Sequence, residues 1–372
     1  MNKLSIPRDA LLKGLSSVAG VVERKQTLPI LGNVLIEPKD GLLCLTASDM
    51  EIQMRHEVAI DRELAGGKEI APFTVNARKL SEILRASAGE TVDLQWDAGK
   101  CTVKCGKSRF SLLTLPAEDF PLVKAASDYS DEPLVVEQGV CKRALGRTQF
   151  AMAVHDIRFY LNGMLLAIDA RKFAVVATDG HRLAIEQSEA GQEMEDRSVI
   201  LPRKAVAEML RLMGDGKDKV EIRFASNQVR VAFGSTEMVS KLIEGKFPDY
   251  QRVLPKQNGV QVEMERAVLL GALQRVAIMT SDKFKGVLLR FSNGLLSISS
   301  KNAENEEGTE EVEIDYQGAD IEVGFNVAYL LDALSTIDSE KVRLFLRDSA
   351  SSMLVRIPDE DGFQYVVMPM RI

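Results

Sequence analysis

The chain has 372 residues and a net charge of −7, from 47 lysines and arginines against 54 aspartates and glutamates. Hydrophobic residues make up 45% and charged residues 27%, which is ordinary for a soluble globular protein. The acidic balance argues against a protein that holds nucleic acid by bulk charge attraction, and no apolar run approaches the roughly 20 residues that a membrane span needs.

The N-terminal segment and the cysteines bear on the cellular compartment. Residues 1–7 lack the apolar core of a signal peptide, so we expect a cytoplasmic protein. Cys101 and Cys105 flank Val103 and share one face of a predicted strand, which indicates core positions. Their spacing is not that of a zinc site, and we expect neither a metal ion nor a cofactor.

The first third of the chain predicts two helices among strands. Residues Lys3 to Ile6 alternate between apolar and polar, as in a strand. Pro7 opens the first helix, and its apolar face is made by Leu11, Leu12, Leu15 and Val18. A second helix is expected from Asn76 to Leu84. Further strands are expected around Val34, Leu43, Ile52, Val92, Val103 and Leu112. Two helices against seven or eight strands indicate an α+β domain with mainly antiparallel sheet.

This pattern occurs three times. A Gly-led apolar run begins at Gly32, Gly163 and Gly286, and each is followed by a second strand and a helix. The three helices begin at Asn76, Pro202 and Asn326, at intervals of 126 and 124 residues, with an acidic residue in register at Glu82, Glu208 and Asp332. A repeat of about 124 residues is long enough for a domain with its own core. We predict three domains, over residues 1–127, 128–254 and 255–372.

Charge is distributed unevenly between helices and loops. The predicted helices carry Arg78, Lys79 and Arg85 in the first repeat and Arg203, Lys204 and Arg211 in the second, whereas acids gather between residues 304 and 313. Such segregation suits a protein that contacts nucleic acid with one surface. An ordinary solvated helix face explains the same pattern, and the sequence leaves both interpretations open.

No catalytic motif in the sequence is complete. Gly106-Lys-Ser108 lacks the first glycine of a phosphate-binding loop, because position 101 is cysteine. His181, two residues after Asp179, is the best candidate for a hydrolase, but Asp and Gly also supply the chemistry of a turn. The tail at residues 368–372 is apolar, which indicates either docking on another surface or a last edge strand.

Five longer motifs carry a resemblance. They are Leu28-Pro-Ile-Leu-Gly-Asn33, Arg158-Phe-Tyr-Leu-Asn-Gly163, Ala177-Thr-Asp-Gly-His-Arg-Leu183, Phe247-Pro-Asp-Tyr-Gln-Arg-Val253 and the terminal Met368-Pro-Met-Arg371. In order and interval, from Leu4 to Ile372, the chain resembles the bacterial DNA polymerase III beta subunit family, the sliding clamps. The resemblance implies three similar clamp domains, each with two helices packed on antiparallel sheets. It implies a non-catalytic homodimer, closed head to tail into a ring around duplex DNA.

The resemblance also implies three sets of site residues. Sequence-independent DNA contacts are expected at Arg24, Arg78, Lys79, His155, Phe159, Tyr160, Arg203 and Lys204. The family pattern has glutamine at the position of His155 and tyrosine at that of Phe159, so these two depart from it. The dimer interface is expected at Arg109, Phe110 and Leu112 on one side and Ile278 and Met279 on the other, with Glu304 as a charge partner.

The third set is a groove for short linear peptides between the second and third domains. It is expected to be lined by Leu161, Thr178, Gly180, His181, Arg182, Leu183, Pro248, Arg252, Val253, Val366, Met368, Pro369, Met370 and Arg371. The partners implied are the DNA polymerase III alpha subunit, the clamp loader delta subunit, other polymerases and repair proteins. The alternatives from other classes are a small-molecule hydrolase using His181 and Asp179, and a monomeric DNA-binding regulator.

Overall fold

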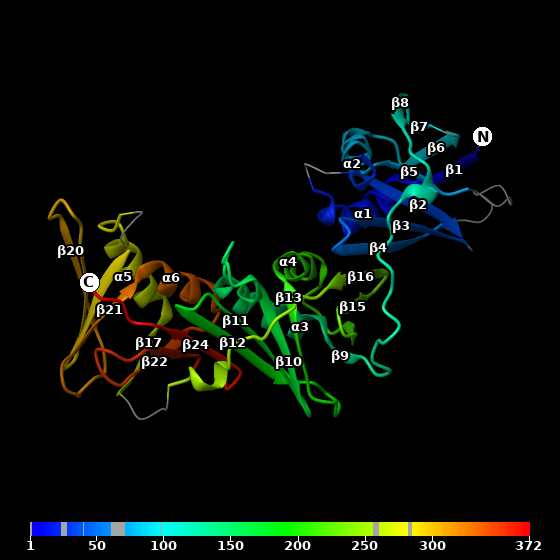
Figure 1. Ribbon diagram of the computed structural model, residues 1–372. Helices are drawn as coiled ribbons and strands as arrows, with labels where there is room; N and C mark the ends of the chain where they lie inside the picture. Colours follow the sequence, from blue (N-terminus) through cyan, green and yellow to red (C-terminus); the bar gives the residue numbers. More distant parts are fainter. Residues whose placement is uncertain are drawn as a thin grey trace. The chain divides into compact units, whose positions relative to one another are not determined.

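The computed structural model describes residues 2–23, 28–39, 41–60, 71–97, 99–255, 260–281 and 285–372 (Figure 1). Within them lie six α-helices and 24 strands, and every strand pairing is antiparallel. The chain forms two compact units, Met1–Gly139 with Ala207–Leu242, and Val140–Val206 with Ile243–Ile372.

The order strand, helix, strands, helix, strands occurs three times, as the sequence predicts. The first repeat contains β1 (Asn2–Pro7), α1 (Arg8–Val18), β2 (Asn33–Lys39), β3 (Leu42–Ser48), β4 (Ile52–Ala59), β5 (Phe73–Asn76), α2 (Ala77–Ala86), β6 (Thr91–Asp97), β7 (Lys100–Cys105) and β8 (Ser108–Leu113). The second contains β9 (Leu134–Glu137), α3 (Gln138–Thr148), β10 (Gly163–Asp169), β11 (Lys172–Thr178), β12 (Arg182–Glu189), β13 (Arg197–Pro202), α4 (Arg203–Leu212), β14 (Lys219–Phe224), β15 (Gln228–Phe233) and β16 (Thr236–Lys241). The third contains β17 (Val260–Glu265), α5 (Arg266–Ala277), β18 (Gly286–Ser292), β19 (Leu295–Lys301), β20 (Glu307–Glu313), β21 (Ile321–Asn326), α6 (Val327–Thr336), β22 (Lys341–Leu346), β23 (Met353–Arg356) and β24 (Phe363–Val367).

Local signals explain where the helices begin. Asn76 caps α2 by accepting a hydrogen bond from the Lys79 amide at 2.9 Å, and Asn326 caps α6 by accepting one from Ala328 at 3.0 Å. These side chains satisfy amides that have no partner inside the helix. Pro7 precedes α1, where its missing N–H costs nothing and its fixed φ suits the entry.

Each repeat divides its strands between two half-sheets of four. The eight-stranded sheet of the first unit has the order β5-β2-β3-β4-β16-β15-β14-β9, so strands of the first and second repeats meet at β4 and β16. The eight-stranded sheet of the second unit has the order β13-β10-β11-β12-β24-β23-β22-β17, and the second and third repeats meet at β12 and β24. The domain boundaries at residues 127 and 254 stay predictions.

Two of the half-sheets are not joined to another half-sheet among the described residues and stay four-stranded. The sheet β1-β6-β7-β8 ends at β8, and the sheet β20-β19-β18-β21 ends at β20. By their place in the repeat, β8 corresponds to β16 and β24, and β20 corresponds to β4 and β12. Both edges therefore present unpaired backbone groups in the described part of the chain.

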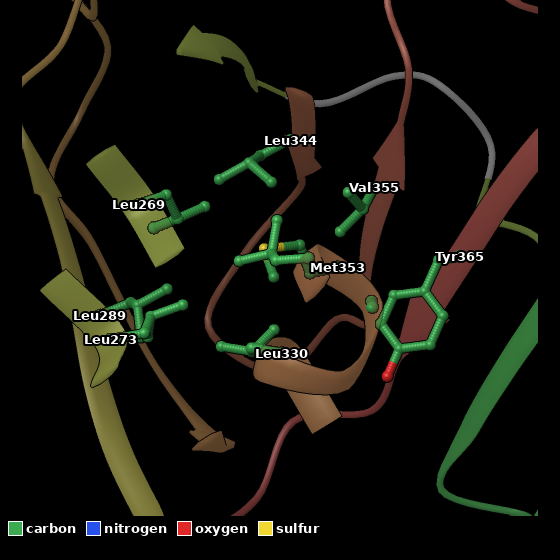
Figure 2. Close-up of a pocket in the computed structure, with 10 residues that line it drawn as sticks. Leu269, Leu273, Leu289, Leu330, Leu344, Met353, Val355 and Tyr365 are labelled. Atoms are coloured by element: carbon green, nitrogen blue, oxygen red, sulfur yellow. The ribbon is translucent and has the colours of Figure 1, made fainter. Parts of the chain in front are cut away.

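Apolar side chains fill the interior between helices and sheets. The four cysteines are free thiols and all are buried, and Cys101, Val103 and Cys105 share the inner face of β7, as predicted. In the third repeat, leucines of α5 and α6 face those of β18 and β22 around a cavity of only about 10 Å³ (Figure 2). The ring of Tyr365 closes one side of this cavity, and its hydroxyl donates to the Tyr329 carbonyl at 2.9 Å (Figure 2). This core is closely packed and leaves no room for a ligand at this point.

A buried arginine joins the second and third repeats within the second unit. Arg147, only 5% exposed, donates to Asp338 Oδ1 at 2.6 Å and to Glu360 Oε2 at 2.7 Å. Its Nη1 also lies 3.5 Å from Glu186 Oε2, on a side chain that is itself buried. Burial raises the pKa of Glu186, although Arg147 opposes that rise.

We expect Arg147→Ala to destabilise the protein by about 3–5 kcal/mol at neutral pH, because it leaves the Glu186 carboxylate buried without its cation. The pKa of Glu186 in the folded state is raised above its unfolded value near 4.5. Below that pH the carboxyl group is protonated in both states, so Arg147→Ala costs little stability. The destabilisation grows as the pH rises through the folded pKa, because the buried group then becomes charged. Thermal unfolding of Arg147→Ala and of Arg147→Ala with Glu186→Gln, between pH 5 and 8, measures both effects. A double variant no more stable than the single one contradicts this account.

Candidate functional site

A groove of about 120 Å³ opens on the second unit. It is lined by Arg158, Tyr160, Leu161, Thr178, Gly180, Arg182, Leu183, Pro248, Tyr250, Val253, Val366 and Met368. These residues lie at the end of β11, in the turn before β12 and at its start, in or beside two short 3-10 helices (Phe159–Leu161 and Tyr250–Arg252), in β24 and in the tail. Nine of the fourteen predicted groove residues lie in this lining; His181, Arg252, Pro369, Met370 and Arg371 lie outside it.

The Asp-Gly-His-Arg segment forms the turn at one wall of the groove. Asp179 Oδ1 accepts hydrogen bonds from the amides of His181, at 2.9 Å, and Arg182, at 3.1 Å. Thr178 Oγ1 accepts from the Gly180 amide at 3.1 Å, and Gly180 has φ +89°, which suits glycine. The carboxylate is thus committed to the turn, and the exposed His181 ring stacks 6.4 Å from Tyr329. The hydrolase alternative finds no support in this geometry.

Arg182 anchors the same wall to the third repeat. Its guanidinium donates to Asp179 Oδ2 at 3.1 Å, to Asp332 Oδ2 of α6 at 2.6 Å and to the Phe150 carbonyl at 2.7 Å. Its charged carbon also lies 4.5 Å from the Tyr329 ring centroid. A planar guanidinium can satisfy several acceptors and stack on a ring at once, so this contact holds the groove wall in one geometry.

The C-terminal tail lies along the groove. Residues 368–372 follow β24 and belong to no strand, so their interpretation as a last edge strand is wrong; β24 itself is paired on both sides, with β12 and β23. Beyond it, the Met368 amide donates to the His181 carbonyl and the Met370 amide to the Gly324 carbonyl, each at 2.9 Å. The tail is docked on residues of the second and third repeats, and Met368 reaches the groove lining.

A loop and the 3-10 helix that follows it, Phe159–Leu161, carry two of the predicted DNA contacts. His155 is exposed with φ +55°, and Phe159 is 66% exposed. Arg203, at the start of α4, donates to the Met152 and Ala153 carbonyls at 3.3 Å and holds the beginning of the loop. Tyr160, also predicted to contact DNA, has its side chain at the groove wall.

An ion pair connects this loop to the groove turn. Arg158 donates to Asp156 Oδ1 at 3.0 Å and Oδ2 at 2.8 Å, and these hydrogen bonds lower the pKa of Asp156 to about 2. Arg158 also donates to the Asp179 carbonyl at 3.3 Å. The exposed loop and the groove therefore share one arginine.

The other predicted DNA contacts lie on helices or outside the described residues. Arg78 and Lys79 are exposed at the start of α2, and Lys204 is partly buried in α4. Arg24 lies outside the described residues. Among the described residues there is no cluster of three or more metal-ligating side chains, and no helix there is long and apolar enough to cross a membrane.

Comparisons with known proteins decide the family. Models of the N-terminal, central and C-terminal domains of the DNA polymerase III beta subunit match residues 2–124, 135–249 and 251–371. The chain belongs to the DNA polymerase III beta subunit family. The beta sliding clamp of Pseudomonas putida is 44% identical over 370 residues, 99% of each chain, and that of Escherichia coli K12 is 41% identical over 372 residues, all of each.

Solved structures of sliding clamps agree. A Pseudomonas aeruginosa sliding clamp has a TM-score of 0.94 at 42% identity, and one from Caulobacter crescentus has 0.91 at 34%; both comparisons cover 100% of each chain. The DNA clamp fold predicted from the sequence is confirmed, and the function is that of a sliding clamp.

The predicted interface residues of this clamp lie on β8 and at the end of α5, and Met279 there packs against β20. Arg109, Phe110 and Leu112 lie on β8, with Phe110 38% exposed. Ile278, 74% exposed, and Met279 directly follow α5. Met279 lies below β20, because a Cβ added at Gly308 would meet its Cγ at 2.8 Å.

Sequence reasoning missed part of the groove of this clamp. Arg158 and Tyr250 were not predicted to line it, and Tyr160 was assigned to DNA alone. All three lie within motifs that carry the family resemblance, 158–163 and 247–253, so the signal was the motif rather than the single residue.

Gly324, on β21, leaves room for the tail. A Cβ added there would lie 2.6 Å from the Met370 carbonyl oxygen and from Ile372 Cδ1. We expect Gly324→Ala to displace the tail, so that carboxypeptidase removes the last residues faster than in the wild type while the unfolding temperature changes by only a few degrees. Gly271→Ala is the control, because its Cβ would meet only the end of the flexible Arg275 side chain. Equal digestion rates for the two variants contradict this role of Gly324.

Proposed function

We propose that two copies of this chain close head to tail into a ring around duplex DNA, and that the ring tethers a replicative polymerase. The clamp is a non-catalytic accessory subunit of the DNA polymerase III holoenzyme and acts in the cytoplasm. Because a closed ring cannot leave DNA sideways, it needs only weak, sequence-independent phosphate contacts and can slide. The three domains extend over residues 1–127, 128–254 and 255–372.

The observation that carries this proposal is the pair of unpaired sheet edges. Inside the chain, β16 pairs with β4 and β24 with β12. β8 and β20 occupy the corresponding places in the repeat and lack such a partner among the described residues. Pairing β8 of one copy with β20 of the other completes a third eight-stranded sheet. The two surfaces differ, so the association is heterologous and ends when the ring closes.

The register of the internal pairing predicts the contacts of this third sheet. Met238 lies opposite Met54 where β16 meets β4, and the corresponding residues of β8 and β20 are Phe110 and Gly308. Phe110 would then cover Met279 through the gap that Gly308 leaves. Arg109 would lie opposite Thr309, with Glu307 and Glu311 on either side of it on the same face. Opposite charges on neighbouring strands stabilise the pairing.

Basic and aromatic residues supply the DNA contacts. Arg24, Arg78, Lys79, Arg203 and Lys204 contribute charge to the surface that faces DNA, and His155, Phe159 and Tyr160 contact it from the loop. Histidine donates a hydrogen bond to phosphate as glutamine does, whereas Phe159 lacks the hydroxyl of tyrosine and contacts DNA through its ring alone.

The groove binds short linear peptides. Its lining is mainly apolar with a few fixed polar groups, the composition of a site that buries apolar anchors. A sliding clamp of Pseudomonas aeruginosa, 43% identical to this chain, has been solved bound to griselimycin. The partners are the DNA polymerase III alpha subunit, the clamp loader delta subunit, other polymerases and repair proteins, which compete for one groove.

Arg109→Glu is expected to raise the dimer dissociation constant at least tenfold, because it places like charges beside Glu307 and Glu311. Sedimentation velocity over a concentration series measures this change. A compensating Glu307→Arg in the same chain should recover part of the affinity. If wild type and Arg109→Glu have equal dissociation constants, the proposed edge pairing is wrong.

The topological link is tested on nicked circular plasmid, loaded with the cognate clamp loader and ATP. Wild-type protein should stay on the circle and leave after a single cut, because linear DNA lets a ring slide off. Arg109→Glu should not be retained on either form. Retention that survives linearisation means binding by affinity and contradicts the ring.

Removal of residues 368–372 is expected to weaken binding of the C-terminal peptide of the cognate alpha subunit at least tenfold, because the groove loses Met368 and its apolar wall. The dimer dissociation constant should stay unchanged. Fluorescence anisotropy with a labelled peptide measures the affinity, and Gly271→Ala is the control. Unchanged affinity after truncation excludes the tail from the site.

A further inference from the structure

An arginine on α4 caps the end of a helix from the preceding repeat. Arg211 donates to the Ser16 carbonyl at 2.8 Å and to the Ser17 carbonyl at 3.2 Å, both in the last turn of α1. Glu208 holds this arginine, with Arg211 Nε 3.1 Å from Glu208 Oε2. The last carbonyls of a helix lack helical partners and carry partial negative charge, so an arginine there is stabilising.

The first repeat carries the same pair on α2. Arg85 follows Glu82 by three residues, as Arg211 follows Glu208, and both pairs have the same place in the repeat. Arg85 and Glu82 are exposed, and neither has a hydrogen bond or ion pair with another described residue. Among the described residues, no main-chain carbonyl at a helix end accepts a hydrogen bond from Arg85, so the partner that Arg211 has on α1 is missing here.

The repeat identifies the missing helix end. In a head-to-tail ring, the third repeat of a second copy takes the place that precedes the first repeat. Its first helix is α5, which begins at Arg266 as α1 begins at Arg8, each directly after a strand. Ser16 and Ser17 of α1 therefore correspond to Gln274 and Arg275 of α5. Both are exposed at the last turn of that helix, next to Ile278.

We propose that Arg85 donates hydrogen bonds to the main-chain carbonyls of Gln274 and Arg275 in a second copy of this chain. This contact would join α2 of one copy to α5 of the other, beside the proposed pairing of β8 with β20. This inference rests on the homodimer proposed above. It adds a contact between helices to an interface argued so far from strands.

The side chain of Arg275 does not oppose this contact. Its Nε lies 2.9 Å from Glu310 Oε1 and its Nη2 2.8 Å from Glu310 Oε2, a bidentate pair that neutralises the charge and holds the guanidinium against β20. The main-chain carbonyl of the same residue lies at the end of α5, where it accepts a hydrogen bond from the Ile278 amide at 3.2 Å and keeps a second lone pair for another donor. A second guanidinium can approach that carbonyl without meeting an uncompensated cation.

The two joints differ in the role of the acidic residue. Glu208 lies against Gly20, where an added Cβ would collide with its carboxylate. Ile278, which directly follows α5, corresponds to Gly20. Its side chain occupies the space in which the Glu208 carboxylate lies at the internal joint, so a carboxylate does not fit there. Glu82 consequently stays beside Arg85 on the solvent side, and Arg85 alone makes the contact with the helix end.

The test compares the two arginines in the full-length chain. Arg85→Ala should raise the dimer dissociation constant about tenfold or more, because it removes charge-assisted hydrogen bonds at an interface. Its unfolding temperature, measured at a concentration where every variant is monomeric, should equal that of the wild type. Arg211→Ala should show the reverse, a lower unfolding temperature and an unchanged dissociation constant. Glu82→Gln should change the dissociation constant less than Arg85→Ala does.

Arg171→Ala, which removes the same charge from an exposed turn, is the control and should leave both quantities unchanged. A dimeric wild type with an unchanged dissociation constant in Arg85→Ala overturns this inference and leaves the homodimer standing. Loss of DNA retention by Arg85→Ala without weaker dimerisation also overturns it, because the arginine then contacts DNA rather than the second copy. A wild type that stays monomeric at all concentrations overturns the homodimer and this contact together.

Discussion

The pairing of one half-sheet with the next is the interaction on which the rest of this protein depends. Each repeat ends one half-sheet at an open strand, and open strands must find partners for their backbone groups. β4 finds β16 and β12 finds β24, so repeats are joined by continuous sheet rather than by a flexible linker alone. The groove exists because β24 inserts beside β12 and delivers the C-terminal tail to its wall.

Arginines reinforce these sheet joints. Arg211 caps α1 in the first unit, whereas Arg147 and Arg182 join the second and third repeats in the second unit. Each uses several guanidinium donors, at least one of which reaches a carboxylate or carbonyl of a neighbouring repeat, and a lysine could not satisfy the same acceptors in this geometry. Strand pairing sets the distance between repeats, and these guanidinium contacts fix their orientation within each unit.

Much of the fold and part of the groove could be predicted from the sequence, for reasons particular to this chain. The repeat is visible because strands alternate and helices begin at Asn76 and Asn326, residues that cap helices by local hydrogen bonds. The Asp179–Gly180 turn is local as well. The groove walls at Arg158 and Tyr250 were missed because residues distant in the sequence meet there, and only tertiary packing selects which of them face inward. The tail could not be assigned for the same reason, since its hydrogen-bond acceptors, His181 and Gly324, lie far away along the chain.

The order of the strands also sets when each sheet can be completed during synthesis. β4 ends at Ala59, but its partner β16 begins only at Thr236, so the ribosome must add about 180 residues before the first joint can form. At 5–20 residues per second this leaves the β4 edge open for roughly ten to forty seconds. β12, which ends at Glu189, waits in the same way for β24, which begins at Phe363. A nascent clamp thus exposes pairing-competent edges throughout its translation, and two ribosomes close together on one message would bring such edges within reach of each other.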